Sequence, residues 1–310
     1  MIGSTEPPSA GIADAPPGNW VDRYAPSWFE PYLKLARADR PIGVWLLLLP
    51  GWWSIALAAP EGQIPDLGAM ALFAIGAWVM RGAGCTFNDI VDRDFDSQVE
   101  RTRRRPLPSG QVNVPLAVLW MVLLAGIGFM VLVQFNAVAI GLGVASLVLV
   151  AIYPYMKRVS WWPQLFLGLT FNWGALLGWA AITGVIGVAA ICLYLGGVAW
   201  TLGYDTIYAH QDKEDDALVG IKSTARLLGP ATQVWLFGFY AMALAGFLLA
   251  GAVAGLGWPF YLIMLGGAAH LGWQAGTVSI DDPGDCLAKF RSNKTFGLLV
   301  LAAIIAGQWR

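Results

Sequence analysis

Residues 113–134 read NVPLAVLWMVLLAGIGFMVLVQ, a long apolar run without one charged side chain. About 20 apolar residues in a helix span the hydrocarbon layer of a bilayer. Comparable runs recur at 41–60, 66–86, 136–153, 163–182, 185–204, 231–251, 257–276 and 294–309. The sequence therefore predicts an all-α, polytopic membrane protein with about nine transmembrane helices.

The composition supports a membrane location. Of 310 residues, 57% are hydrophobic and 13% are charged, whereas soluble domains average about 25% charged residues. Residues 1–36 are expected to form a flexible tail with an interfacial aromatic stretch from Trp20, and residues 37–310 a single transmembrane domain. Residues 1–19 contain Glu6 and Asp14 but no Lys or Arg, so no targeting peptide is expected.

The basic residues predict the orientation, because Lys and Arg concentrate in cytoplasmic loops. The 19 basic residues lie almost entirely before the first run, after the second, fourth and sixth runs, and just before the ninth. Only Arg310 is expected on the outside. We therefore expect a multi-pass protein of the bacterial cytoplasmic membrane, with its polar loops facing the cytoplasm.

Two of the polar breaks carry the same acidic spacing. Asp92 and Asp96 follow the second apolar run, Asp212 and Asp216 follow the sixth, and a shift of 120 residues relates the two pairs. Positions i and i+4 share one face of a helix, and Asn88 extends the first face by one turn. Carboxylates suit Mg²⁺, which usually binds one or two of them plus the phosphates of a substrate. The spacing predicts a magnesium-diphosphate site at the membrane surface.

Cationic side chains lie beside both pairs. Residues 101–110 read RTRRRPLPSG, and Lys222-Ser223-Thr224 comes six residues after Asp216. Guanidinium groups match the geometry of phosphate oxygens. A solvated loop laced with ion pairs is the plainer alternative, but it explains neither the four-residue spacing nor its repetition. The chain has no Gly-x-x-x-x-Gly-Lys-Ser/Thr loop, which excludes a P-loop nucleotide hydrolase.

The cysteines and histidines show no metal-binding pattern. Cys85, Cys192 and Cys286 form no C-x-x-C pair, and the only histidines are His210 and His270. These five residues are expected to be structural, and neither a zinc nor a haem site is expected.

Three segments combine the acidic and basic residues described above. They are Asn88-Asp89-x-x-Asp92-x-x-x-Asp96, the stretch from Arg101-Thr102 to Arg105-Pro106-Leu107-x-Ser109-Gly110, and Tyr208-Ala209-x-x-Asp212-x-x-Asp215-Asp216 followed by residues 220–224. Together they resemble the UbiA superfamily of intramembrane aromatic prenyltransferases. The resemblance runs from about residue 32 to the end. Within the superfamily, residues 37–43, 153–158, 163–164 and Gly168 are most similar to enzymes that prenylate 4-hydroxybenzoate in ubiquinone biosynthesis.

The resemblance implies nine helices around a central cavity that opens toward the cytoplasm. It also implies a Mg²⁺-dependent transfer of a polyprenyl group from polyprenyl diphosphate to the ring carbon ortho to the hydroxyl of 4-hydroxybenzoate. The implied catalytic and metal-binding residues are Asn88, Asp92, Asp96, Asp212 and Asp216. The implied substrate-binding residues are Arg37, Arg101, Arg105, Arg158, Tyr208 and Lys222, with Arg158 or Arg37 facing the acceptor carboxylate. No nucleic acid or protein partner is expected.

Three alternatives stay open. The acceptor can be another aromatic compound, such as homogentisate, a naphthoate or haem. A cation channel or transporter also places carboxylates in a polar mouth, but its spans should contain ionisable residues, and these spans contain almost none. A CDP-alcohol phosphatidyltransferase should show Asp-Gly-x-x-Ala-Arg, which is missing.

Overall fold

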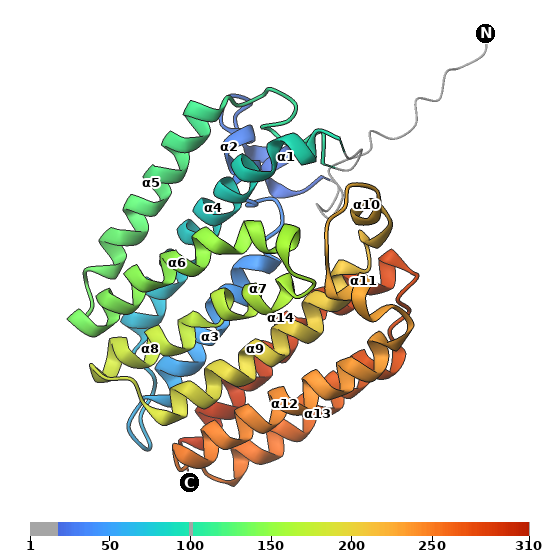
Figure 1. The fold of residues 1–310 in the computed structure, drawn as a ribbon. Helices are drawn as coiled ribbons and strands as arrows, with labels where there is room; N and C mark the ends of the chain where they lie inside the picture. Colours follow the sequence, from blue (N-terminus) through green and yellow to red (C-terminus); the bar gives the residue numbers. More distant parts are fainter. Residues whose placement is uncertain (1–17, 99–101, 310) are drawn as a thin grey trace. The chain divides into compact units, whose positions relative to one another are not determined.

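The computed structural model describes residues 18–98 and 102–309, and all regular elements in these ranges are helices (Figure 1). The chain groups into two compact units. The first contains the chain up to Pro41 together with Val79–Gly126, and the second contains Ile42–Trp78 and Ile127–Arg310. The expected division into a tail, 1–36, and one domain, 37–310, stays a prediction.

The first unit holds two short helices and parts of two long ones. The short helices are α1 (Trp20–Tyr24) and α2 (Glu30–Leu35), and the long ones are α4 (Leu67–Asp96) and α5 (Val114–Leu132). Asn19 begins α1, because its Oδ1 accepts hydrogen bonds from the backbone nitrogens of Val21 and Asp22 at 2.9 and 3.2 Å. The aromatic stretch expected at the interface thus starts as a capped helix.

The core of the first unit joins α4 to α5 and to the end of α2. Ala36, Val79, Ala83 and Leu124 are buried against one another. Gly82 permits this approach, because a Cβ there would lie 2.9 Å from Leu124 Cδ1 and 3.0 Å from Ala36 Cβ. A second buried group, Leu35, Leu107, Val112 and Ala117, fixes the segment after α4 against the same helices.

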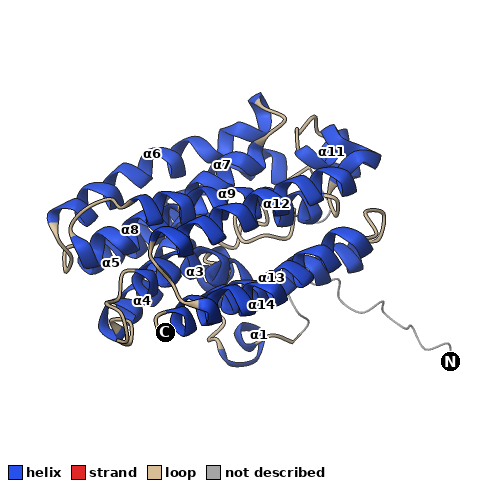
Figure 2. Ribbon diagram, turned by 90° about the horizontal axis from the view of Figure 1, so that it is seen from below, coloured by secondary structure: helices blue, strands red, loops and turns tan. Residues whose placement is uncertain are grey.

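The second unit contains the remaining helices. They are α3 (Ile42–Leu57), α6 (Ala137–Val159), α7 (Pro163–Phe171), α8 (Trp173–Thr183), α9 (Val188–Ala209), α10 (Lys213–Leu218), α11 (Thr224–Leu228), the 3₁₀ turn η1 (Gly229–Ala231), α12 (Thr232–Val253), α13 (Trp258–Thr277) and α14 (Pro283–Gly307). Helix α9 packs against α7, α12 and α14, and α3 packs against α8 and α14. Figure 2 shows α13 lying beside α14.

Small residues let these helices approach closely. A Cβ on Gly178 of α8 would lie 2.6 Å from the carbonyl oxygen of Gly51 in α3. A Cβ on Gly246 of α12 would lie 2.6 Å from the Cα of Gly196 in α9. Close backbone contact through small residues is a usual way for helices to associate within a bilayer.

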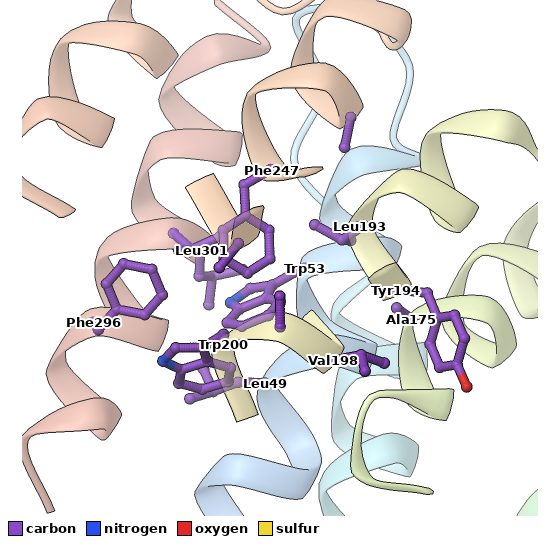
Figure 3. Close-up of a cluster of buried hydrophobic side chains, with 14 of the residues drawn as sticks. Leu49, Trp53, Ala175, Leu193, Tyr194, Val198, Trp200, Phe247, Phe296 and Leu301 are labelled. Atoms are coloured by element: carbon purple, nitrogen blue, oxygen red, sulfur yellow. The ribbon is translucent and has the colours of Figure 1, made fainter. Parts of the chain in front are cut away.

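Aromatic rings fill the centre of the second unit (Figure 3). The Trp53 and Trp200 ring centroids lie 5.3 Å apart, and Phe247 and Phe296 complete the cluster. Both indoles find acceptors, since Trp53 Nε1 donates to the Gly297 carbonyl at 2.7 Å and Trp200 Nε1 donates to Asn293 Oδ1 at 2.8 Å. Buried tryptophans normally require such partners.

The span expected at 163–182 is found as Pro163–Thr183 and consists of two consecutive helices, α7 and α8. The break falls at Asn172, whose side-chain amide donates to the Gly168 carbonyl at 2.9 Å and to Thr201 Oγ1 at 2.8 Å. These bonds compete with the regular helical ladder and hold the break against α9. Composition alone could not reveal it, because Asn172 is the only strongly polar residue between Thr170 and Thr183.

The prediction of an all-α, multi-pass membrane protein is confirmed. Among the described residues, six helical segments are long and apolar enough to cross a bilayer. They are Leu67–Asp96, Val114–Leu132, Ala137–Val159, Pro163–Thr183, Val188–Ala209 and Thr224–Val253. The other three expected spans coincide with α3, which is apolar but only 16 residues long, with α13 and with α14. Exposed Leu119, Val122 and Leu123 on α5 suit contact with lipid. The central cavity stays a prediction.

Candidate active site

The first acidic motif occupies the last turns of α4. Asn88, Asp92 and Asp96 follow one another at four-residue intervals, so they share one helix face. Asp92 is fully buried, Asp96 is nearly so and Asn88 is half-buried. Carboxylates that are withdrawn from water in this way require charged or hydrogen-bonding partners.

The segment after α4 folds back, so that the guanidinium of Arg105 contacts the acidic face of α4. Thr102 Oγ1 donates to the backbone carbonyl of Asp96 at 2.8 Å. Arg105 Nη1 then lies 2.8 Å from Asp96 Oδ2 and 3.4 Å from Asp89 Oδ1. The structure thus brings together Arg105 and one of the predicted metal ligands. Arg101, also predicted to bind substrate, lies outside the described residues.

Arg37 joins the same cluster from the segment before α3. Its Nη2 lies 2.5 Å from Asp89 Oδ1, and its Nη1 donates to the Lys34 carbonyl at 3.1 Å. Burial alone would lower the pKa of Arg37, but the Asp89 carboxylate raises it above its ordinary value, so the guanidinium stays charged. Arg37 also has a left-handed backbone, with φ of 57°, which a non-glycine residue rarely adopts.

Asp89 was absent from the residues predicted to form the site. It was visible in the sequence as the second residue of Asn88-Asp89, but it lies outside the four-residue spacing; three residues before Asp92 and seven before Asp96, it shares their side of α4. The structure shows it fully buried, with two arginines on one of its oxygens.

The second acidic motif begins where α9 ends. Asp212 precedes α10, and the backbone nitrogen of Asp216 donates to the Asp212 carbonyl at 2.8 Å. The two residues are therefore one helical turn apart, as their spacing predicted. Gly220 turns the chain with φ of 76°, and Arg226 Nη1 donates to the Asp216 carbonyl at 3.4 Å and to the Ile221 carbonyl. These contacts fix the loop that carries the motif.

Lys222 is held by the end of α6. Its backbone nitrogen donates to the Lys157 carbonyl at 2.9 Å, and its Nζ donates to the Val159 carbonyl at 3.1 Å. The structure therefore brings Lys222 beside the segment that contains Arg158. Arg158 is half-buried, with its guanidinium carbon 5.7 Å from the centre of the Tyr155 ring. The expected contribution of Lys222 to the anion beside Asp216 stays a prediction.

An aromatic strip leads along α9 to the second motif. Trp200, Tyr204 and Tyr208 recur every four residues in α9, so neighbouring members of the series lie one turn apart, and Asp212 follows three residues after the end of the helix. Phe290 of α14 covers the last part of this strip, with its ring centroid 5.7 Å from that of Tyr204 and 4.5 Å from that of Tyr208. Sequence reasoning identified Tyr208 but missed Phe290, since nothing in the sequence around Phe290 marks it.

His210 anchors the end of α9. It is buried, and its Nε2 lies 3.0 Å from Thr232 Oγ1 at the start of α12. Burial, together with the nearby positive charge of Lys213, lowers the pKa of His210 to about 4. Lys213 in turn pairs with Asp281 in the loop before α14. This agrees with the expectation that His210 is structural.

The donor set of each motif suits magnesium. Within residues 18–98 and 102–309, no group of three or more His, Cys, Asp or Glu side chains is arranged to hold a metal ion. Mg²⁺ seldom needs such a group, because substrate phosphates and water complete its coordination. Paired carboxylates one helical turn apart, with arginine and lysine nearby, match that mode of binding.

The fold and these motifs define a helical membrane protein that carries paired carboxylates at the ends of its spans. Comparison with known proteins gives the particular family. The model of the UbiA prenyltransferase family matches residues 47–301. The chain belongs to this family, and it is a prenyltransferase. The resemblance found in the motifs is thereby confirmed.

Several curated relatives are identical to this chain at about half of the aligned positions. The mitochondrial 4-hydroxybenzoate polyprenyltransferase of Arabidopsis thaliana is 49% identical over 293 residues, which cover 94% of this chain and 72% of the relative. The protein of the same name from Rattus norvegicus is 50% identical over 285 residues, which cover 91% of this chain and 76% of the relative.

Solved structures share the fold. The apo structure of a UbiA homolog from Aeropyrum pernix K1 matches with a TM-score of 0.67 and 24% identity, covering 85% of this chain and 96% of the other. A UbiA homolog from Archaeoglobus fulgidus, bound to GPP and Mg²⁺, matches with a TM-score of 0.65 and 16% identity, covering 89% and 99%. At these identities the likeness establishes the fold alone.

Proposed function

We propose that this prenyltransferase transfers a polyprenyl group from polyprenyl diphosphate to 4-hydroxybenzoate, as a step of ubiquinone biosynthesis. One observation carries the proposal. Over more than nine-tenths of this chain, about half of the aligned residues are identical to those of relatives named for this activity. The channel and phosphatidyltransferase alternatives are excluded by membership of the prenyltransferase family.

Mg²⁺ bound by Asp92, Asp96, Asp212 and Asp216, with Asn88 as a further oxygen donor, would neutralise the charge that grows on the leaving diphosphate. The fit of the two donor sets supports this assignment, and a homolog of the same fold from Archaeoglobus fulgidus is described as bound to GPP and Mg²⁺. Arg105 adds a guanidinium that already contacts Asp96, and Arg101 and Lys222 add further positive charge. Fixed charges of this kind stabilise a developing anion without reorganising during the reaction.

The positive charge that develops on the prenyl group must be protected from water. As the allylic C–O bond breaks, the ring carbon ortho to the acceptor hydroxyl attacks, and loss of the ring proton restores aromaticity. Tyr208, four residues before Asp212, and Phe290 present two rings whose centroids lie 4.5 Å apart. Aromatic faces stabilise a developing carbocation and exclude water from it. Arg158 is the proposed partner of the acceptor carboxylate.

The orientation follows from the basic loops. Arg93 lies in the last turn of α4, and Arg103, Arg104 and Arg105 follow that helix. Lys213, Lys222 and Arg226 follow α9, and this distribution supports a cytoplasmic position for both motifs. The relatives are named as mitochondrial proteins. The bacterial inner membrane stays a prediction for this chain.

A panel of acceptors tests the proposed function. The purified protein in detergent receives one polyprenyl diphosphate, Mg²⁺ and, in separate reactions, 4-hydroxybenzoate, homogentisate or a dihydroxynaphthoate. We expect prenylation of 4-hydroxybenzoate in clear preference to the others. Turnover of homogentisate or the naphthoate without turnover of 4-hydroxybenzoate would reject the acceptor while leaving prenyl transfer intact.

Single carboxylate variants test the metal assignment. Asp92→Asn and Asp212→Asn should each lower kcat by about 100-fold or more, and EDTA should abolish activity until Mg²⁺ is restored. Glu214→Gln is the matched control, because Glu214 lies in the same short helix as Asp216 but is exposed. Near-normal turnover of both Asp variants would exclude these residues from the site.

A further inference from the structure

Two cations share one exposed tryptophan ring in the loop that follows α6. The Lys222 ammonium lies 5.9 Å, and the Arg226 guanidinium carbon 5.4 Å, from the centre of the Trp161 ring. Lys222 lies just before α11 and Arg226 lies within it, so both cations come from the segment after the second acidic motif. Trp161, Lys222 and Arg226 together form the cationic patch.

The patch keeps its positive charge. Lys222 Nζ donates to the Val159 carbonyl at 3.1 Å, and Arg226 Nη1 donates to the carbonyls of Asp216, at 3.4 Å, and Ile221. These acceptors carry no net charge, and neither cation forms an ion pair with a carboxylate in residues 18–98 and 102–309. The Nε and Nη2 donors of Arg226 bond to none of these residues either. Two positive charges and several N–H groups are therefore left for an anion.

An exposed apolar stripe of α6 leads to the patch. Its members recur every three or four residues, so they share one face of the helix. They are Val144, Val148, Ile152, Tyr155 and Val159. Val159, the last of them, is the residue whose carbonyl holds Lys222. Apolar side chains of this kind contact lipid chains, whereas tryptophan, lysine and arginine gather where the membrane meets water. The patch therefore lies at the level of the lipid headgroups.

A second exposed surface borders the patch on α12. The Trp162 ring centroid lies 6.0 Å from that of Trp235, which is exposed in the first turn of this helix. Leu227, next to Arg226, and Val234 are also exposed. The patch thus has apolar surface on two sides, which suits a ligand with a charged head and two hydrocarbon chains.

We propose that the cationic patch binds the phosphate of an anionic phospholipid, whose acyl chains lie along the exposed faces of α6 and α12. A guanidinium binds phosphate oxygens through charge-assisted hydrogen bonds, and basic sites between membrane helices favour anionic headgroups. A zwitterionic lipid brings a cation of its own into the patch and binds more weakly. Because Arg226 also holds the carbonyls of Asp216 and Ile221, the bound lipid stabilises the loop that carries the second acidic motif.

The proposal goes beyond prenyl transfer, and it depends on neither the donor nor the acceptor. It is tested with the purified full-length chain in mixed micelles of detergent and lipid. The Tm is measured against increasing phosphatidylglycerol or, in parallel, phosphatidylcholine with the same acyl chains, and the retained lipid is counted by native mass spectrometry. We expect phosphatidylglycerol to raise the Tm, and to stay bound, at concentrations where phosphatidylcholine does neither.

Removal of the Arg226 charge should weaken this response. Arg226→Gln should raise the half-maximal phosphatidylglycerol concentration by about fivefold, the usual effect of one basic residue near an anionic surface. Arg93→Gln is the matched control, because Arg93 is another exposed arginine but pairs with Asp94 at the end of α4. Lys222 is left unchanged, since it also belongs to the proposed diphosphate site.

A second variant tests the patch without touching Arg226. Val159→Glu places a carboxylate beside Lys222 and removes no hydrogen bond, because Val159 contributes only its backbone carbonyl. It should weaken the response to phosphatidylglycerol, whereas Val159→Gln should keep it. This pair decides the question even if Arg226→Gln does not fold.

Several results would overturn the proposal. One is an equal response of the native chain to both lipids. Another is a lower Tm of Arg226→Gln in both lipids with an unchanged half-maximal concentration, which would mean that Arg226 only fastens the loop. An unchanged response of Val159→Glu would also reject the site. A similar rise in Tm with soluble glycerol 3-phosphate would show that the patch binds a free phosphate and not a lipid.

Discussion

The ring of Phe290 in α14 lies 4.5 Å from the ring of Tyr208 in α9, with an interplanar angle of 41°. This contact forms an aromatic pair at Tyr208, four residues before Asp212. Aromatic pairs contribute about 0.5–1.5 kcal/mol beyond the area they bury. Such an energy favours the observed position of the Tyr208 ring over alternatives.

Loss of the Phe290 ring should therefore impair turnover. We expect Phe290→Ala to lower kcat by about threefold to tenfold at saturating substrates, and Phe290→Tyr to retain most activity because it keeps the ring. Phe135→Ala is the matched control, since it removes one ring of the Phe73–Phe135 pair, whose centroids lie 5.4 Å apart in another part of the second unit. Equal kcat for Phe290→Ala and the native chain would show that the pair only stabilises the fold.

The sequence predicted the positions of the membrane spans better than the breaks and ends of the helices. Apolar runs marked a helix or a helix pair at each expected span, because burial in lipid requires continuous apolar surface. The break at Asn172 escaped prediction, since it depends on a hydrogen bond to Thr201, a residue of another helix. Helix α14 begins at Pro283, earlier than the expected span at 294, because a helix can start in its capped polar segment before it enters the bilayer.

In the candidate site, too, local relationships were predicted from the sequence, whereas contacts between distant residues were not. The four-residue spacing of Asp212 and Asp216 predicted their shared helix face, because that relationship is local. The ion pair of Arg37 with Asp89 joins residues 52 positions apart, and the Tyr208–Phe290 pair joins two different helices. Such contacts depend on how the helices pack, which no local pattern of residues encodes.

Acid should destabilise the fold through His210. Its pKa is lowered from 6.5 to about 4 in the folded protein, so between pH 6.5 and 4 the unfolded chain binds more protons than the folded one. Stability therefore falls as the pH falls through this window. We expect a loss of about 1–2 kcal/mol, allowing for partial solvation of the ring, seen as a lower Tm. His210→Gln, which keeps a donor for Thr232, should reduce the slope; identical slopes would exclude His210 as the source.

The orientation can be measured with single cysteines. In a variant without Cys85, Cys192 and Cys286, new cysteines at Ser109 and Leu218 should resist a membrane-impermeant thiol reagent in intact cells. Leu218 is 86% exposed and is preferable to Gly220, whose φ of 76° disfavours any side chain. A cysteine at Val185, which is 59% exposed in the turn before α9, should be labelled. Labelling of Ser109→Cys or Leu218→Cys from outside would reverse the proposed topology.

The acceptor carboxylate should depend on Arg158. This guanidinium lies at the end of α6 and is the one proposed to grip the benzoate with two parallel hydrogen bonds, which a lysine cannot reproduce. Arg158→Lys should raise the KM for 4-hydroxybenzoate by about tenfold and leave the KM for polyprenyl diphosphate unchanged, because only acceptor binding loses its paired contact.

A neutral acceptor provides the control for this variant. Methyl 4-hydroxybenzoate lacks the carboxylate, so Arg158→Lys should use it as well as the native chain does, at whatever rate the native chain shows. An arginine that merely anchors α6 to lipid headgroups would leave the acceptor KM unchanged. That result would transfer the carboxylate contact to Arg37, which would then have to leave Asp89 whenever 4-hydroxybenzoate binds.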